Sequence, residues 1–173
     1  MNDYCDNCIL RLYNKNYNLH GIGNSYNSKM IIVTNVDFNA YKYNSLDYSK
    51  QVEIIKDVLK PISSTGEVSE IYITPLIKCR ISKDVYIDYQ IIDNCKKHLY
   101  KEISDYGIKD ILLLGDAAKI ILGIKYIGSF RTKQFKLNGI IYRVSYNPFV
   151  KNKDINKYEM FKHDIIRWYY DNK

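Results

Sequence analysis

The sequence predicts an α/β protein, built as a single-domain three-layer sandwich with a mostly parallel central sheet. Short apolar runs rich in β-branched residues alternate with longer segments in which apolar residues recur every three or four positions. Such alternation is typical of a parallel sheet covered by helices. The 173 residues are enough for one hydrophobic core, so we expect one domain over residues 1–173.

The first third of the chain contains one expected strand and one expected helix. Residues 28–36, SKMIIVTNV, form an apolar run bounded by polar residues, as expected of a buried strand. The polar and aromatic stretch 37–48 is expected to be a long surface loop. A helix is expected over residues 49–60, where apolar side chains recur at helical spacing until Pro61 ends the pattern.

The middle of the chain repeats this alternation. Residues 70–77, EIYITPLI, predict a second strand, with Pro75 at its end or at the edge of the sheet. Residues 88–106 predict an amphipathic helix, which Gly107 is expected to end. The run KDILLLG at 109–115 predicts a buried third strand.

The last third is expected to hold a short helix at 116–123, a hairpin within 128–148 and a final helix at 157–173. The hairpin turn is expected at the LNG tripeptide, because Asn-Gly favours a tight turn between strands. Ligands of parallel sheets bind where the strands end. The loops after the first, second and last strands are therefore expected to carry any chemistry.

Composition points to a basic protein without membrane segments. The formal net charge is +7 and the chain contains 18 tyrosines. A basic surface favours nucleic acid or another polyanion, and tyrosine can stack on bases. No apolar run is long enough to span a membrane, and no signal peptide opens the chain. We therefore expect a cytoplasmic protein with no membrane association.

The four cysteines form one short-spaced pair and two single residues. Cys5 and Cys8 make a Cys-x-x-Cys pair, whereas Cys79 and Cys95 stand alone. Disulfides are not expected in the cytoplasm. Structural zinc sites usually combine two short-spaced pairs, whereas an iron–sulfur cubane takes thiolates from separate segments. The spacing favours an iron–sulfur cluster, with zinc or unligated buried thiols as alternatives.

The order of motifs along the chain resembles that of the iron–sulfur (family 4) uracil-DNA glycosylases. The resemblance covers roughly residues 5–168 and implies that family's fold, with a 4Fe-4S cluster held by the four cysteines. The matching motifs are CDNC at 5–8, Gly21-Ile22-Gly23, YITPLIKCR at 72–80, Cys95 within a helix, LGDAAKIILG at 114–123 and YNPF at 146–149.

The motifs that carry the family's chemistry depart from its pattern. The first active-site loop, GEAPG in the family, corresponds here to 34–38, which lacks both glycines and the acid and has Asn35 and, slightly out of register, Asp37. The uracil-reading asparagine corresponds to Pro75, which has no side-chain amide. The histidine of the late loop corresponds to Asn147. These replacements together argue against ordinary uracil excision.

Three functional hypotheses follow from this resemblance. The first is a non-catalytic, cluster-bearing DNA-binding protein that acts as an accessory in DNA replication or repair. The second is an active glycosylase for uracil or another modified base, in which Asp37 orients water and Asn35 or Asn147 donates hydrogen bonds. The structural alternative is that Asp37 caps a helix or loop and that Asn147 forms a turn. The third is a protein-interaction module without DNA binding.

The resemblance also indicates partners and a DNA-binding surface. Residues with AT-rich codons, the compact size and the altered motifs suggest a bacteriophage or another virus, so the host cytoplasm and a polymerase or other replication protein are expected. The chain would be a monomer or a subunit of a hetero-complex. Phosphate contacts are expected from basic residues forming a rim on one face, with Phe149 as a wedge between bases. These basic candidates are Lys78, Arg80, Lys83, Arg131, Lys133, Lys136, Lys151 and Lys153.

Overall fold

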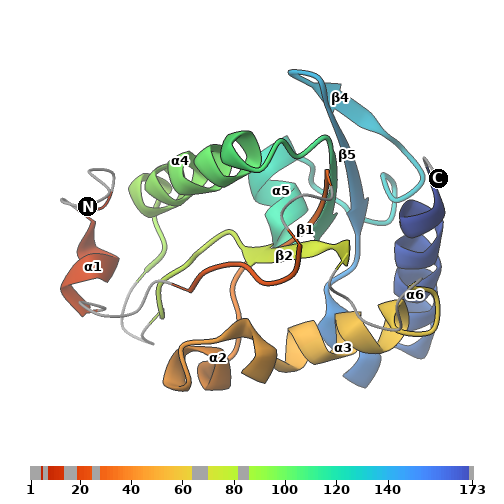
Figure 1. Ribbon diagram of the computed structural model, residues 1–173, viewed down its shortest axis with the longest axis horizontal. Helices are drawn as coiled ribbons and strands as arrows, with labels where there is room; N and C mark the ends of the chain where they lie inside the picture. Colours follow the sequence, from red (N-terminus) through yellow and green to blue (C-terminus); the bar gives the residue numbers. More distant parts are fainter. Residues whose placement is uncertain are drawn as a thin grey trace.

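The computed structural model describes residues 5, 8–13, 19–24, 28–63, 70–81 and 86–171. Its centre is one five-stranded sheet in the order β2-β1-β3-β5-β4 (Figure 1). Neighbouring strands are parallel except for the antiparallel pair of β4 and β5. The predicted α/β class with a mostly parallel sheet is therefore confirmed. The strands are β1 (Lys29–Val33), β2 (Tyr72–Pro75), β3 (Asp110–Leu114), β4 (Phe135–Leu137) and β5 (Ile140–Ser145).

Helices cover both faces of the sheet, which is compatible with a three-layer arrangement. Figure 1 shows α4 and α5 on one face and α2, α3 and α6 on the other. Two short 3₁₀ helices, η2 (Leu46–Tyr48) and η4 (Pro148–Asn152), connect these elements. The α-helices are α1 (Ile9–Tyr13), α2 (Phe38–Lys42), α3 (Lys50–Leu59), α4 (Tyr89–Asp105), α5 (Asp116–Leu122) and α6 (Ile155–Tyr170).

The sheet separates two hydrophobic cores because successive side chains of a strand point to opposite faces. In β1, Met30 and Ile32 pack with α4 and α5, whereas Ile31 and Val33 pack with α3 and α6. All four side chains are fully buried. An apolar run without polar alternation is the pattern expected when helices cover both faces of a parallel sheet.

Helix α4 has clear signals at both ends. The Asp88 side chain accepts a hydrogen bond from the Ile91 backbone N–H at 2.8 Å and so caps the first turn. Gly107, with φ of 60°, lies just beyond the last turn, as predicted. Between these ends, one stripe of the helix is buried at three- and four-residue spacing. It consists of Ile91, Cys95, Leu99 and Ile103.

The expected surface loop at 37–48 is the main error of the sequence-based prediction. This segment forms α2 and η2 instead. Three of its side chains, Ala40, Tyr41 and Leu46, are buried against the core under α3 and α6. The burial of these few apolar side chains stabilises short helices that local composition alone did not indicate.

The segment at 19–24 lies close against the edge strand β2. Ile22 and Ile73 exchange two backbone hydrogen bonds of 2.9 and 2.8 Å in an antiparallel bridge. The following Gly23 has φ of 95°, and a Cβ atom there would lie 1.9 Å from the Ile71 carbonyl oxygen. Glycine is therefore required at this approach. The prediction that Pro75 ends a strand at the sheet edge is confirmed.

A buried carboxylate connects three strands with the last helix. Asp110, at the start of β3, is 4% exposed. Its Oδ1 accepts hydrogen bonds from Arg143 Nη1 in β5 at 2.5 Å and from Trp168 Nε1 in α6 at 2.9 Å. Lys29 Nζ of β1 lies 3.9 Å from its other oxygen. A charge in a core is tolerated only when it is paired, so these donors make this carboxylate compatible with burial.

Lys29 also donates hydrogen bonds to backbone carbonyls at the C-terminal end of α6. Its Nζ donates hydrogen bonds to the backbone carbonyls of Trp168, Tyr169 and Asp171 at 2.6, 2.9 and 2.8 Å. The last carbonyls of a helix have no partner within it and carry partial negative charge. The first strand therefore fixes the end of the last helix.

We predict that Asp110→Ala lowers the free energy of unfolding by about 3–5 kcal/mol, because it removes the buried acceptor of Arg143 and Trp168 and leaves Arg143 only its 3.4 Å contact with the Asp171 carboxylate. Denaturant unfolding followed by circular dichroism measures the change. The matched control is Asp93→Asn, which removes an exposed ion pair with Lys97 on α4 and should cost less than about 0.5 kcal/mol. Equal effects of the two variants would contradict the assigned role of Asp110.

Candidate functional site

The Cys-x-x-Cys pair lies in a turn that leads into α1. The Cys8 N–H donates to the Cys5 carbonyl at 3.0 Å, and the Arg11 N–H donates to the Cys8 carbonyl at 3.0 Å. Cys8 is 7% exposed and packs in the same buried cluster as Cys79 and Cys95. The N-terminal segment therefore reaches the core on the α4 side of the sheet.

Cys79 and Cys95 come from two other segments of the chain. Cys79 lies in the loop that leaves β2, and Cys95 lies in the buried stripe of α4. Both are free thiols and both are buried. The Lys78 backbone donates a hydrogen bond to Cys95, which connects the loop directly to the helix.

The four thiols are near enough to act on one another electrostatically. Burial raises the pKa of Cys79 to about 12, and the charges of Cys95, Cys5 and Cys8 add to the shift. Burial also raises the pKa of Cys95 to about 11, with further contributions from Cys8 and Cys5. Four thiolates at this position would repel one another, so their ionisation together requires a bound cation.

A cavity of about 170 Å³ lies between these segments and is lined by Cys5, Cys79 and Cys95. This volume is well above that of one water molecule. Among the described residues, no group of three or more His, Cys, Asp or Glu side chains is arranged to hold a metal ion. A single zinc ion would require thiolate sulfurs at about 2.3 Å.

His98 is a member of this site that sequence reasoning missed. Its Nε2 lies 2.8 Å from Cys5 Sγ, within hydrogen-bond distance, and the ring tautomer decides which atom donates. His98 follows Cys95 by three residues and therefore lies on the same face of α4. Burial lowers its pKa, and the nearby Lys78 charge adds to this effect. The spacing from Cys95 is the sequence signal that could have identified it.

Lys78, a predicted DNA contact, is engaged inside the protein. Its Nζ donates to Glu102 Oε2 at 2.8 Å, to Thr74 Oγ1 at 2.8 Å and to the Pro75 carbonyl at 3.3 Å. Burial lowers the Lys78 pKa, while Glu102 opposes that shift. The ion pair neutralises the lysine beside the cysteine cavity, and Glu102 lies seven residues after Cys95 on the same helix face.

Asp37, the candidate water-orienting acid, joins two helices. Its carboxylate accepts hydrogen bonds from the Asn39 N–H at 3.1 Å, the Ser49 hydroxyl at 3.0 Å and the Lys50 N–H at 2.7 Å. The first caps α2, and the other two come from the start of α3. Both oxygens of Asp37 are therefore engaged in fixing helix ends.

The other two candidate catalytic residues lie where parallel strands end, but they follow strands that are not neighbours in the sheet. Asn35 is exposed beyond β1, and Asn147 follows β5. Because β3 lies between these strands, their ends are separated by about 10 Å. The Asn147 side chain accepts a hydrogen bond from the Phe149 N–H at 2.9 Å and caps η4.

Two buried oxygens near the end of β1 have no hydrogen-bond partner within the described residues. They are Thr34 Oγ1, directly after β1, and Gln51 Oε1, in the first turn of α3. Pro75, which corresponds to the base-reading position, is buried and pairs with Val33 of β1. Thr34 Oγ1 and Gln51 Oε1 are therefore without a hydrogen-bond partner in the described part of the chain. Pro75 places no side-chain amide at the base-reading position.

The remaining predicted DNA contacts are spread over the molecule. Arg131 forms two hydrogen bonds of 2.7 and 2.8 Å with Asp164. Lys136 of β4 pairs with Ile141, near the start of β5. Lys136 therefore lies at the end of the sheet opposite the loops that follow the parallel strands. Lys83 lies outside the described residues.

Four predicted DNA contacts flank or follow the last strand. Phe149 is partly buried against the core next to α3 and α6. Lys151 and Lys153 are exposed in and after η4, and Lys151 Nζ lies 3.8 Å from an Asp57 carboxylate oxygen. Lys133 is exposed, with its Nζ 4.8 Å from the Phe130 ring centroid. The structure does not bring all of the basic candidates to one rim.

Arg80 belongs to a different feature, which we call the aromatic–cationic surface: Phe38, Lys42, Tyr43, Tyr48 and Arg80. Phe38, Tyr43 and Tyr48 are each more than half exposed. The Arg80 guanidinium lies 4.6 Å from the Phe38 ring centroid, and the rings of Tyr43 and Tyr48 lie 4.5 Å apart. Lys42 Nζ lies 5.0 Å from the Tyr43 ring centroid. Exposed rings beside cations are the combination that single-stranded nucleic acid binds.

Comparison with protein-family models and with curated proteins gives no match for this chain. These comparisons therefore assign the chain to no family. In the described part of the chain, no helix combines the length and apolar character needed to cross a membrane.

We predict that Cys79 and Cys95 in the metal-free folded protein react slowly with iodoacetamide. Only the thiolate reacts, and at pH 8 their raised pKa values leave thiolate fractions on the order of a hundredfold or more below that of free cysteine. Because each pKa is raised, the rate should increase about tenfold per pH unit up to roughly pH 11. Mass spectrometry of the alkylated peptides measures this, with urea-unfolded protein as control. Equal rates in both states would contradict the prediction.

Proposed function

We propose that this protein is a DNA-binding member of the iron–sulfur uracil-DNA glycosylase superfamily, with a structural 4Fe-4S cluster and without ordinary uracil excision. In this proposal it acts as an accessory in DNA replication or repair. The observation that carries the proposal is the approach of four free cysteines, from three separate segments, to one another beside a cavity. That donor set is the one a cubane requires.

The donor set fits an iron–sulfur cluster. A cubane binds thiolates at its separate corners, and the four cysteines supply thiols from three separate segments that interact electrostatically. Cys5, Cys8, Cys79 and Cys95 would hold it. The bound cluster would supply positive charge that stabilises the thiolates. Its binding free energy would add to the stability of the fold.

The contacts around the cysteines support a structural role for this site. The Cys5–Cys8 turn belongs to the N-terminal segment, Cys79 to the loop after β2, and Cys95 to α4. Ligation would therefore fasten the N-terminal segment to the helix and the loop. The loop is further fixed by the buried Lys78–Glu102 ion pair.

The residues at the strand ends support a loss of uracil excision. Excision requires a group that orients water and donors that stabilise the departing base. Asp37 is engaged by three hydrogen bonds at helix ends, and Asn147 caps η4. Pro75 offers no side-chain amide for reading uracil.

DNA binding is supported by the aromatic–cationic surface beside the ends of β1 and β2. Bases can stack on the exposed rings of Phe38, Tyr43 and Tyr48, while Arg80 and Lys42 attract the phosphates. The surface suits single-stranded DNA because unpaired bases expose both ring faces. Lys78 and Arg131 form ion pairs within the protein and are not part of this surface.

The cluster is tested by anaerobic reconstitution with iron and sulfide. We predict broad absorbance at about 400 nm, with about four iron atoms per chain. Cys79→Ser and Cys95→Ser should each lose most of this iron, whereas Lys136→Gln should retain it. A colourless protein that binds one zinc ion through the same cysteines would contradict the cluster and favour the zinc alternative.

DNA binding is tested with single-stranded oligonucleotides across a salt series. We predict that the affinity falls linearly with salt on logarithmic axes. Phe38→Ala should weaken binding by about 1–3 kcal/mol through lost stacking, and Arg80→Gln should reduce the salt dependence. Lys136→Gln, at the opposite edge of the sheet, is the control. No binding by the wild type would favour a protein-interaction module.

The same oligonucleotides, prepared with uracil, test for residual catalysis. The proposal expects no abasic sites after incubation with the reconstituted protein. Abasic sites that disappear with Asp37→Ala would overturn the non-catalytic assignment and favour an active glycosylase.

A further inference from the structure

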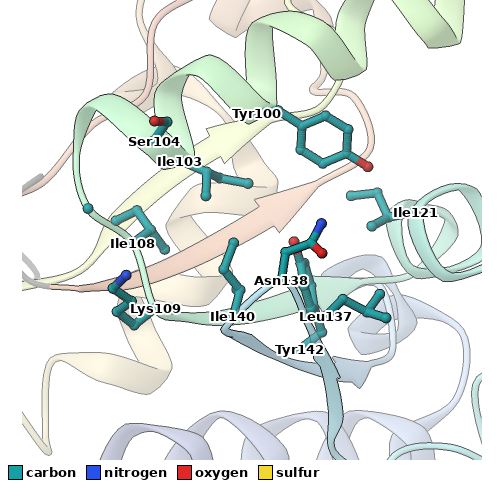
Figure 2. Close-up of a pocket in the computed structure, with 11 residues that line it drawn as sticks. Tyr100, Ile103, Ser104, Ile108, Lys109, Ile121, Leu137, Asn138, Ile140 and Tyr142 are labelled. Atoms are coloured by element: carbon teal, nitrogen blue, oxygen red, sulfur yellow. The ribbon is translucent and has the colours of Figure 1, made fainter.

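A second cavity, of about 400 Å³, lies where β3 and β5 begin. Figure 2 shows it between the C-terminal part of α4, the end of α5 and the β4–β5 hairpin. None of the residues that line it belongs to the cysteine cavity or to the aromatic–cationic surface. None of the functions proposed above uses this cavity.

The walls of this cavity are mainly aliphatic. Figure 2 shows side chains that converge on it from helices and strands distant in the sequence. The volume falls within the range of about 300–1,000 Å³ that is usual for small-molecule sites. The aliphatic lining residues are Ile103, Ile108, Ile121, Leu137 and Ile140.

A few polar groups accompany these apolar walls. Tyr100 and Tyr142 line the cavity, and no hydroxyl hydrogen bond joins either ring to another residue in the described ranges. Burial raises the pKa of Tyr142, and the nearby Tyr100 adds to this shift. Asn138 extends toward the cavity from the hairpin turn, where its φ is 50° (Figure 2). These groups could orient a ligand by hydrogen bonds.

Lys109 supplies the positive charge of this site. It is exposed, lines the cavity and forms no ion pair with any residue in the part of the chain that the structure describes. By contrast, the exposed lysines of α4, Lys97 and Lys101, are each paired with an aspartate on that helix. An apolar cavity with one uncompensated cation at its rim is complementary to an apolar molecule that carries one negative charge.

We propose that this cavity binds a small ligand with an apolar body and one anionic group directed at Lys109. The aliphatic walls bury the body of the ligand, and the Tyr100, Tyr142 and Asn138 side chains provide its neutral hydrogen bonds. The site is independent of the cluster and of DNA binding.

The charge requirement is tested with two matched fluorescent probes. The first is 8-anilinonaphthalene-1-sulfonate, and the second is N-phenyl-1-naphthylamine, which has the same rings without the sulfonate. We expect both to bind, the sulfonate more tightly. Lys109→Gln should weaken the sulfonate about two- to fivefold and leave the neutral probe unchanged. Lys136→Gln, which alters a neighbouring strand residue outside the cavity, should change neither.

The location of the site is tested by substituting two exposed residues that line the cavity. Ser104→Trp should fill the cavity, and Leu137→Ser should remove apolar contact, so each should weaken both probes about tenfold. Circular dichroism and unfolding curves verify that the variants fold. Unchanged binding in Ser104→Trp would overturn the site.

Two further results would also overturn the proposal. Equal sulfonate binding by Lys109→Gln and Lys136→Gln would remove the anionic requirement. Probe binding that is lost as the chain dimerises at higher concentration would show that a second copy covers the cavity instead.

Discussion

The buried carboxylate of Asp110 is the constraint on which the arrangement of this protein depends. It lies at the start of the central strand and receives hydrogen bonds from Arg143 in β5 and Trp168 in α6. Lys29, in β1, approaches the same carboxylate and satisfies the last carbonyls of α6. An unpaired buried charge costs several kcal/mol. The neighbouring strands and the last helix therefore stay in the one arrangement that pairs every member.

Helix α4 connects the two cavities of the molecule. The side chains of Cys95, His98 and Glu102 face the cysteine cavity, whereas Tyr100 and Ile103 line the second cavity near the helix end. Glu102 compensates the buried Lys78, and His98 contacts Cys5. One helix thus presents thiol, imidazole and carboxylate groups to the cysteine cavity on one face, and Tyr100 and Ile103 to the second cavity on another.

Where the parallel strands end, the polar side chains Asp37 and Asn147 stabilise the fold. Asp37 holds the starts of α2 and α3, and Asn147 caps η4. A carboxylate whose two oxygens accept three hydrogen bonds at the starts of two helices is part of the framework of the fold. The rings of Phe38, Tyr43 and Tyr48 are exposed beside these strand ends, and the Arg80 guanidinium lies over Phe38.

The sequence by itself determined the alternation of strands and helices, the position of Pro75 at a strand end and the Asn138-Gly139 hairpin turn. These features follow from local periodicity and backbone preference, which neighbouring residues encode. Helix α2 was missed because the burial of Tyr41 depends on residues far along the chain. Only the tertiary structure decided that Lys78 is paired, that Asp37 caps two helices and that His98 meets Cys5. Burial and hydrogen-bond partners are set by distant contacts, which no local pattern specifies.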